Sequence, residues 1–195
     1  MLNLERKLSA REFVVTAELP VIDGGGYGEI LRQLEPMRPF VDAYNATDNP
    51  GKYALREGAD GQFAVVGTGV RDETGALQAV RPILDTPLII KKQARNVHDT
   101  VEVILGALSA PVGKNVIMMS VPNNLFRDLQ VIVGGDNIPA RQLLREAFDG
   151  THRPLQYDLG FDPDNSPTYI LNVSVAVKAE GEDGRRRIVP IDRPR

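Results

Sequence analysis

The chain changes its pattern abruptly at residues 48–51, where the tetrapeptide DNPG consists entirely of residues that favour turns. Before this point, residues 12–19 are rich in β-branched side chains and predict a buried strand. Residues 27–37 carry apolar side chains at helical spacing, and residues 40–47 predict a second strand. The opening segment is therefore expected to form a β-α-β crossover of a parallel sheet.

After the tetrapeptide, the alternation of strand and helix gives way to an antiparallel meander. Two short sequences, GADG and DETG, favour tight turns and separate three stretches that predict strands. These stretches are residues 53–57, 62–71 and 76–84. Strands joined by tight turns pair antiparallel, so this part is not expected to continue the parallel crossover.

A third pattern begins at Pro87, where the predicted order becomes β-α-β-β-α-β-β. Asn96 is a suitable N-cap for a helix that ends near residue 110, and Pro139 begins a second helix that Gly150 ends as its C′ residue. The five predicted strands are residues 88–91, 115–121, 130–133, 154–159 and 168–177. The apolar stripes of the two helices predict the core, which consists of Val97, Val101, Ile104, Leu105, Leu108, Ala140, Leu143, Leu144, Ala147 and Phe148. Two helices on one face of a small mixed sheet form a two-layer α+β sandwich.

The composition excludes several classes of site. The chain has no cysteine, which excludes disulfides and cysteine-based zinc sites, and only two histidines, which excludes a histidine-rich metal site. The net charge of −3 argues against general affinity for nucleic acid, and no apolar run is long enough for membrane insertion. The charged N-terminus lacks the apolar stretch of a secretory signal, which predicts a cytoplasmic protein.

Two local motifs invite a chemical interpretation. His98 stands beside Asp99 and could form an acid–base pair, although both residues are also common in the first turn of a helix. Gly134 and Gly135 follow a predicted strand, but GGDNIPA has neither the spacing nor the lysine of a phosphate-binding loop. The sequence therefore favours structural roles at both places.

Two segments before the DNPG turn resemble parts of a known family. FVVTAEL, at residues 13–19, and VDAYNATDNP, at residues 41–50, resemble the first and second strands of short bacterial methylenetetrahydrofolate reductases. Those enzymes are flavin-dependent (β/α)₈ barrels. The resemblance implies that Glu18 is the general acid toward a folate substrate and that Thr47 lies close to an FAD cofactor.

The rest of the chain does not supply the remainder of such a barrel. A (β/α)₈ barrel needs roughly 250 residues, whereas this chain has 195 and most of them follow other patterns. We therefore expect no complete barrel. Glu18 and Thr47 remain open to a second interpretation, in which both are ordinary strand residues without a catalytic or cofactor-binding role.

The block from about residue 51 to 177 is similar to bacterial proteins that look related to the short N-terminal (STN) domain of secretins and TonB-dependent receptors. The similarity is carried by VEVILGALSAPVGKNVIM, by VIVGGDNIPARQLLREAFDGTHRPLQYDL and by TYILNVSVAV. It implies a recognition or assembly unit of the periplasm or cell envelope, which binds a protein partner or a second copy through sheet edges and helix faces. Such a module needs no cofactor.

We therefore expect a non-catalytic, secretin-like interaction module built from four segments. The first alternative is a flavin-dependent oxidoreductase, or a fragment of one, that is related to methylenetetrahydrofolate reductase and acts in folate metabolism. The second alternative is a chimeric chain without a unified function. The segments are a reductase-like unit (1–50), a meander (51–86), an α+β module (87–178) and a charged tail predicted to be disordered (179–195).

Overall fold

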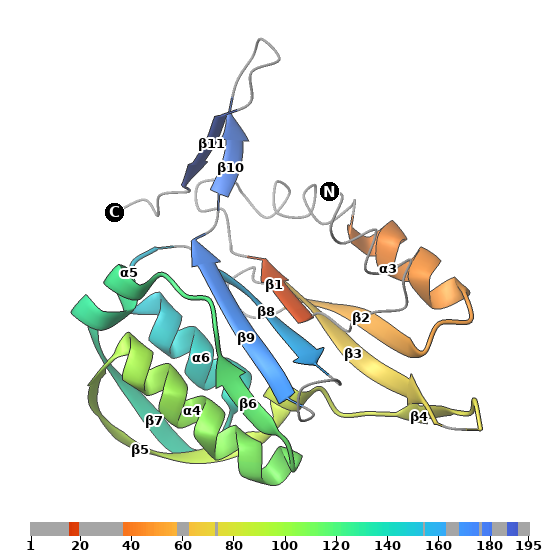
Figure 1. The fold of residues 1–195 in the computed structure, drawn as a ribbon, viewed down its shortest axis with the longest axis horizontal. Helices are drawn as coiled ribbons and strands as arrows, with labels where there is room; N and C mark the ends of the chain where they lie inside the picture. Colours follow the sequence, from red (N-terminus) through yellow and green to blue (C-terminus); the bar gives the residue numbers. More distant parts are fainter. Residues whose placement is uncertain are drawn as a thin grey trace.

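The chain folds into an α+β structure in which a seven-stranded mixed sheet packs against helices and a separate two-stranded ribbon (Figure 1). This computed structural model describes residues 16–19, 37–57, 63–72, 74–153, 155–162, 168–175, 177–180 and 187–190. Over these residues the strands do not close into a ring. The predicted α+β class is therefore confirmed, as is the expectation that the chain is not a complete (β/α)₈ barrel.

The large sheet draws its strands from distant parts of the chain. Its order is β2-β3-β1-β8-β9-β6, and β4 also pairs with β3. Only β6 and β9 run parallel, whereas the other neighbours are antiparallel. Since β1 pairs with both β3 and β8, it joins the meander to the strands of the α+β module. The strands are β1 Thr16–Leu19, β2 Gly51–Glu57, β3 Phe63–Arg71, β4 Leu77–Ala79, β6 Asn115–Met118, β8 Leu155–Asp162 and β9 Thr168–Val175.

Two helices pack between this sheet and the ribbon. Helix α4 contacts β5 and β6, helix α6 contacts β7, and the two helices contact each other. In Figure 1 they lie between the β5–β7 ribbon and strands β6 and β9. No helix in the described ranges has the length and apolar composition that a membrane span requires. The bounds are β5 Pro87–Asn96, β7 Gln130–Pro139, α4 Val97–Val112, α5 Asn123–Asp128, α6 Ala140–Asp149 and the 3₁₀ turn η2 Ile83–Asp85.

The predicted order of elements after Pro87 is confirmed, with the short helix α5 added. The sheet arrangement differs in one respect. Strands β6, β8 and β9 join the large mixed sheet, but β5 and β7 pair only with each other among the described strands. The ribbon therefore covers the helices on the side away from the sheet.

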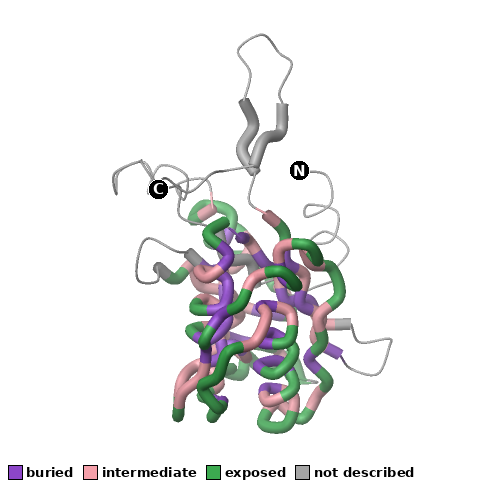
Figure 2. Tube along the Cα trace, turned by 90° about the vertical axis from the view of Figure 1, so that its left-hand side faces the viewer, coloured by how far each residue is buried: buried purple, intermediate pink, exposed green. Residues whose placement is uncertain are grey.

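The core lies where α4 and α6 meet the sheet. All ten stripe residues predicted for these helices are buried. They pack against alternate residues of β8 and β9, because every second side chain of a strand points to the same face. Figure 2 shows the buried positions gathered in the interior of the molecule. The sheet residues in this core are Val116 of β6 together with Leu155, Tyr157, Leu159, Leu171 and Val173 of β8 and β9.

Helix α5 adds an aromatic contact that the sequence analysis does not predict. Phe126 of α5 is fully buried and stacks on Phe148 of α6, with ring centroids 5.8 Å apart. Phe148 in turn contacts Tyr157 of β8 at 5.6 Å. Aromatic pairs add about 0.5–1.5 kcal/mol beyond the burial of their area. The three rings therefore tie α5, α6 and β8 together.

The helix ends follow local rules, with one exception. Asn96 caps α4, because its side-chain oxygen accepts a hydrogen bond from the N–H of Asp99 at 2.7 Å. Gly113 ends α4 in a left-handed conformation with φ of 69°. Gly150, predicted to end α6 in the same way, is right-handed with φ of −63°. Its role is close packing, since a Cβ at this position would lie 2.3 Å from Cγ1 of Val131.

The prediction of a strand at residues 40–47 is wrong, because this segment forms most of helix α3, Met37–Ala46. Pro39 lies in the first turn, where the missing N–H of proline is tolerated. Val41 is buried and Tyr44 is half-buried, so the contact positions recur at helical spacing and not at every second residue. The strand prediction gave more weight to aromatic and β-branched side chains than to this spacing.

The expected parallel crossover is also wrong for the described part of the opening segment. β1 confirms the end of the strand predicted at residues 12–19, but both of its neighbours run antiparallel. Most of the helix predicted at residues 27–37 lies outside the described residues. A β-α-β unit needs a second parallel strand after its helix, and α3 occupies that position in the sequence.

The structure also describes the predicted meander and part of the charged tail. Strands β2, β3 and β4 confirm the meander, although β4 is shorter than the predicted third strand. Within the tail predicted at residues 179–195, the described residues belong to two strands that pair antiparallel, β10 Val177–Glu180 and β11 Arg187–Pro190. Main-chain hydrogen bonds form between these strands irrespective of the charge that suggested disorder.

Replacement of Leu144 by alanine is expected to destabilise the protein by about 2–5 kcal/mol, because this fully buried side chain would leave a cavity between α6 and the sheet. Val103→Ala on the exposed face of α4 is the matched control, with an expected change below about 0.5 kcal/mol. Urea unfolding followed by circular dichroism measures both. Similar losses in the two variants would contradict this assignment of the core.

Candidate functional site

Glu18, the general acid implied by the reductase resemblance, lies in the interior of a sheet. It is part of β1, opposite Ala64 of β3 and Tyr157 of β8. Catalytic groups of a (β/α)₈ barrel stand at the common C-terminal edge of parallel strands. Because both neighbours of β1 are antiparallel, the strand has no such edge. The Glu18 side chain itself lies outside the described part of the structure.

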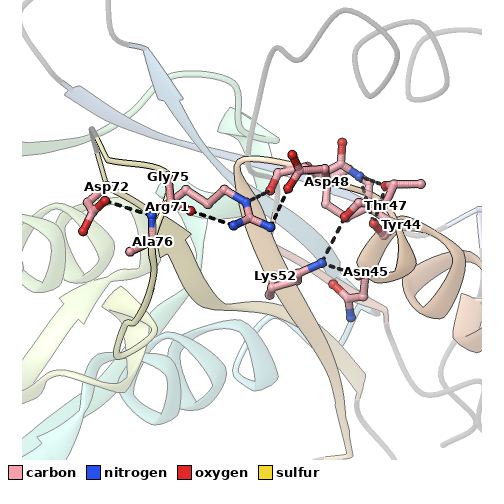
Figure 3. A network of polar contacts seen from close by, with 10 residues as sticks. Tyr44, Asn45, Thr47, Asp48, Lys52, Arg71, Asp72, Gly75 and Ala76 are labelled. Carbon is pink, nitrogen blue, oxygen red and sulfur yellow. Dashed lines mark hydrogen bonds and ion pairs between the residues drawn. The ribbon is translucent and has the colours of Figure 1, made fainter.

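Thr47, the residue implied to lie near the flavin, caps the C-terminus of α3 (Figure 3). Its hydroxyl donates to the carbonyl of Tyr44 at 2.7 Å, and its N–H donates to the same carbonyl at 3.2 Å. The side-chain amide of Asn49 donates to this carbonyl at 2.8 Å and also contacts the Thr47 hydroxyl. These donors satisfy a carbonyl at a helix end, where the next helical turn is missing.

Lys52 and Asn45 fasten α3 to β2 (Figure 3). The Lys52 ammonium donates to the carbonyls of Asn45 and Thr47, where a positive charge also suits the helix dipole. The Asn45 side chain accepts from the N–H of Tyr53 at 2.9 Å and donates to its carbonyl at 2.7 Å. Burial, followed by the nearby Tyr44 hydroxyl, raises the pKa of Tyr53 well above its usual value, so this phenol stays protonated.

Arg71 of β3 connects the same region to the turn between β3 and β4. Its guanidinium forms an ion pair with Asp48 at 2.6 Å. It also donates to the carbonyls of Asn49 at 3.2 Å and Gly75 at 2.7 Å. The segment DAYNATDNP, which carries half of the reductase resemblance, is thus engaged in helix capping and in contacts that anchor α3 to the meander.

Asp72 has the most strongly stabilised carboxylate of this region. The side chains of Thr74 and Gln78 donate to it, at 2.6 Å and 3.0 Å, and backbone N–H groups add further hydrogen bonds. The Thr74 hydroxyl, followed by the Gln78 amide, lowers the pKa of Asp72 to about 2. A proton donor near neutral pH needs the opposite shift. Asp72 therefore stabilises a turn.

His98, Asp99 and Glu102 form a group whose potential ligand atoms lie within 4.8 Å of one another. Nδ1 of His98 lies 3.6 Å from Asp99 and 3.8 Å from Glu102. Both carboxylates are more than half exposed, and that of Asp99 also accepts from the capping amide of Asn96 at 3.0 Å. Exposed pairs of this kind contribute little energy. The geometry favours helix capping over the acid–base interpretation of His98.

Asp85 is a junction between β2, η2 and α6. Its carboxylate contacts Arg56 of β2 at 2.5 Å and Arg141 of α6 at 3.1 Å. The guanidinium of Arg81 donates to the main-chain carbonyl of Asp85 at 2.6 Å. Three arginines thus meet at one residue that lies just before the start of β5.

The β5–β7 ribbon carries the most exposed large apolar side chains among the described residues. The exposed fraction is 77% for Ile89 of β5 and 66% for Ile132 of β7. Leu88 and Ile90, on either side of Ile89, are buried, so the ribbon has an inner face against the helices and an outer face toward solvent. Since each strand pairs only with the other in the described ranges, each has one edge without a strand partner.

A bulge in the ribbon lies beside two exposed lysines, Lys91 and Lys92. The register shifts between Ile90 and Gln93, opposite Gly134 of β7. Gly134 has φ of 148°, and a Cβ there would lie 2.6 Å from the carbonyl oxygen of Ile90 and from the backbone nitrogen of Lys92. Only glycine lets the two backbones approach this closely. The glycine pair therefore shapes the ribbon, in agreement with the rejection of a phosphate-binding loop.

The sequence analysis does not identify this ribbon as a surface. The strand predicted at residues 88–91 is too short, because β5 continues through KKQARN to Asn96. Residues 87–96, PLIIKKQARN, consist of an apolar run followed by basic residues. Such a sequence indicates a longer strand with one face exposed to solvent. The pattern does not show which isoleucine is exposed, because Ile89 and Ile90 are identical in type and differ only in the face they occupy.

The comparisons with known proteins found no matching protein family, curated protein or solved structure. The function is therefore inferred from the geometry of the chain itself.

Replacement of Asn45 by alanine is expected to destabilise the protein by about 1–3 kcal/mol, because both backbone groups of Tyr53 lose their partner. The amide of Tyr53 is expected to exchange its hydrogen faster in this variant. Arg38→Ala, an exposed change on the same helix, is the control for effects of helix composition. Unchanged exchange at Tyr53 would show that Asn45 does not hold α3 against β2.

Proposed function

We propose that the chain is a non-catalytic interaction module that binds a protein segment along the β5–β7 ribbon. The observation that supports it most directly is the exposure of Ile89 and Ile132 on the outer side of one two-stranded ribbon. Single exposed apolar residues are common on protein surfaces. Here the two most exposed ones lie on the same element, which also offers unpaired strand edges.

The free edges provide a way to bind an extended segment. Each strand of the ribbon has ten residues, and the two pair only with each other in the part of the chain that the structure describes. An extended peptide adds to such an edge through main-chain hydrogen bonds, while alternate side chains contact the exposed face. This is the mode of action that the similarity to secretin-type domains implies.

The energy available from the two isoleucines sets the expected affinity. Full burial of one isoleucine contributes about 1.5–3 kcal/mol. Two of them give about 3–6 kcal/mol, which would correspond to dissociation constants of about 6 mM to 40 μM, and the costs of association weaken this binding further. Main-chain hydrogen bonds and charges on the ribbon must therefore contribute to any tighter complex.

The geometry favours this proposal over a flavin- and folate-dependent reductase. Helix α3 occupies the position of the second barrel strand that the resemblance implies, and Thr47 follows that helix. The described sheet is antiparallel except for β6 and β9. Neither arrangement supplies the parallel strand ends on which a barrel enzyme builds its cofactor site.

The proposal predicts that an uncharged extended peptide of alternating valine and glutamine, blocked at both ends, binds at the ribbon. Amide chemical-shift changes should concentrate in β5 and β7. Ile132→Thr should weaken this binding, because it removes apolar contact area while keeping a β-branched side chain. Met119→Thr, an equally exposed change beyond β6, should leave it unaltered. Shifts located elsewhere, or equal effects of the two variants, would count against the ribbon.

A flavin-uptake experiment separates the proposal from its enzymatic alternative. The purified protein, incubated with FAD and passed through a gel-filtration column, is expected to elute without flavin absorbance. A bound flavin that is lost in Thr47→Val would instead support the reductase interpretation, under which Glu18→Gln keeps the flavin and abolishes reductase activity.

A further inference from the structure

The charges of the ribbon are distributed unevenly. Strand β5 carries Lys91, Lys92 and Arg95 and has no acidic residue, whereas β7 carries the single acidic residue Asp136. Both lysines are exposed, while Arg95 is half-buried and donates to the carbonyl of Lys91 at 3.2 Å. The whole chain has a net charge of −3, so this basic ribbon stands out against an acidic background.

Charges of both signs lie at the two ends of β5. The arginines that meet at Asp85 stand just before its first residue, Pro87. Helix α5, which contacts β5, carries Arg127 and Asp128 in its last turn. The basic character therefore belongs to β5 itself, since Asp128 follows Arg127 in α5, and Asp99 and Glu102 of α4 come soon after the end of β5.

We propose that the natural occupant of the ribbon is an extended segment of a partner protein in which acidic side chains lie between apolar ones. This inference rests on the proposed function and specifies its partner. Acidic side chains would meet Lys91 and Lys92, and apolar side chains would cover Ile89 and Ile132. Complementary charges of this kind guide association and reject wrong partners.

The spacing along β5 fits such a segment. Ile132 lies opposite Ala94, so the two exposed isoleucines are separated by the length of strand between residues 89 and 94. At roughly 3.3 Å per residue this length is about 17 Å. Lys91 and Lys92 lie within this interval. A matching segment therefore has an acidic centre of two or three residues with an apolar side chain on each flank.

The same charges argue against a second copy of the chain as the occupant. Pairing of two β5 strands would bring lysines of both copies close together, and like charges opposite each other in a sheet are destabilising. Exposed lysines and bulges also hinder unselective pairing at strand edges. An acidic segment meets the same surface without this repulsion.

A nucleic acid fits the surface less well than an acidic protein segment. The outer side of the ribbon combines its charges with isoleucines, and β5 and β7 contain no aromatic residue on which a base could stack. Extended single strands are bound by such stacking together with charge. The apolar residues of the ribbon are better matched by apolar side chains.

The test compares three blocked fluorescent peptides of equal length that have the same valine-rich flanks and differ only in three central residues, which are glutamate, glutamine or lysine. Fluorescence anisotropy of the full chain is expected to give at least about tenfold tighter binding of the glutamate peptide than of the glutamine peptide, with a decrease as salt is added. The double variant Lys91→Glu, Lys92→Glu should lose this preference and gain affinity for the lysine peptide. The double variant Arg38→Glu, Lys114→Glu changes the net charge equally away from the ribbon and should keep it.

Each outcome decides between the two proposals. Equal binding of the three peptides, still weakened by Ile132→Thr, overturns the acidic partner but leaves the interaction module intact. Peptide binding that neither the lysine pair nor Ile132 affects overturns both. A single-stranded oligonucleotide provides the third comparison. If it binds more tightly than the glutamate peptide, and if the Lys91→Glu, Lys92→Glu variant loses this binding, the occupant is a nucleic acid and not an acidic segment. A two-fold increase in particle mass that Ile132→Thr abolishes replaces it with a second copy.

Discussion

The burial of the apolar stripes of α4 and α6 is the interaction on which the described structure depends. These stripes contact β8 and β9 on one side and the inner residues of the β5–β7 ribbon on the other. The helices thus have apolar neighbours on two sides. The apolar contacts of the ribbon with the core come from its inner face. Among the described residues, its outer face carries the exposed isoleucines and each of its strands has one edge without a strand partner, and the proposed binding surface follows from this arrangement.

The N-terminal part of the described chain has a structure different from the one that its resemblance to a reductase implies. The segment that resembles a reductase strand is helical, and its polar residues cap that helix and anchor it to β2 and β3. Threonine, asparagine and aspartate serve equally well in a cofactor site and at a helix end, because both require short polar side chains that bond to nearby groups. Residue identity alone does not distinguish the two uses.

The ribbon combines three properties that are separately common. Exposed isoleucines supply contact area, lysines at a bulge supply selectivity, and the unpaired edges supply main-chain donors and acceptors. The lysines limit unselective strand pairing, and the same charges favour an acidic partner. Under the proposal, protection against unselective strand pairing and choice of partner rest on the same two lysines.

The sequence by itself determined the local features. The stripe of α6, the Asn96 cap and the order of elements after Pro87 follow from periodicities and capping rules that act within a few residues. Only the tertiary structure decided that residues 40–47 are helical, that Gly150 is needed for packing against Val131, and that Ile89 faces solvent while Ile90 is buried. Strand pairing and burial depend on contacts between residues far apart in the chain, and a local pattern carries no information about which distant element will provide them.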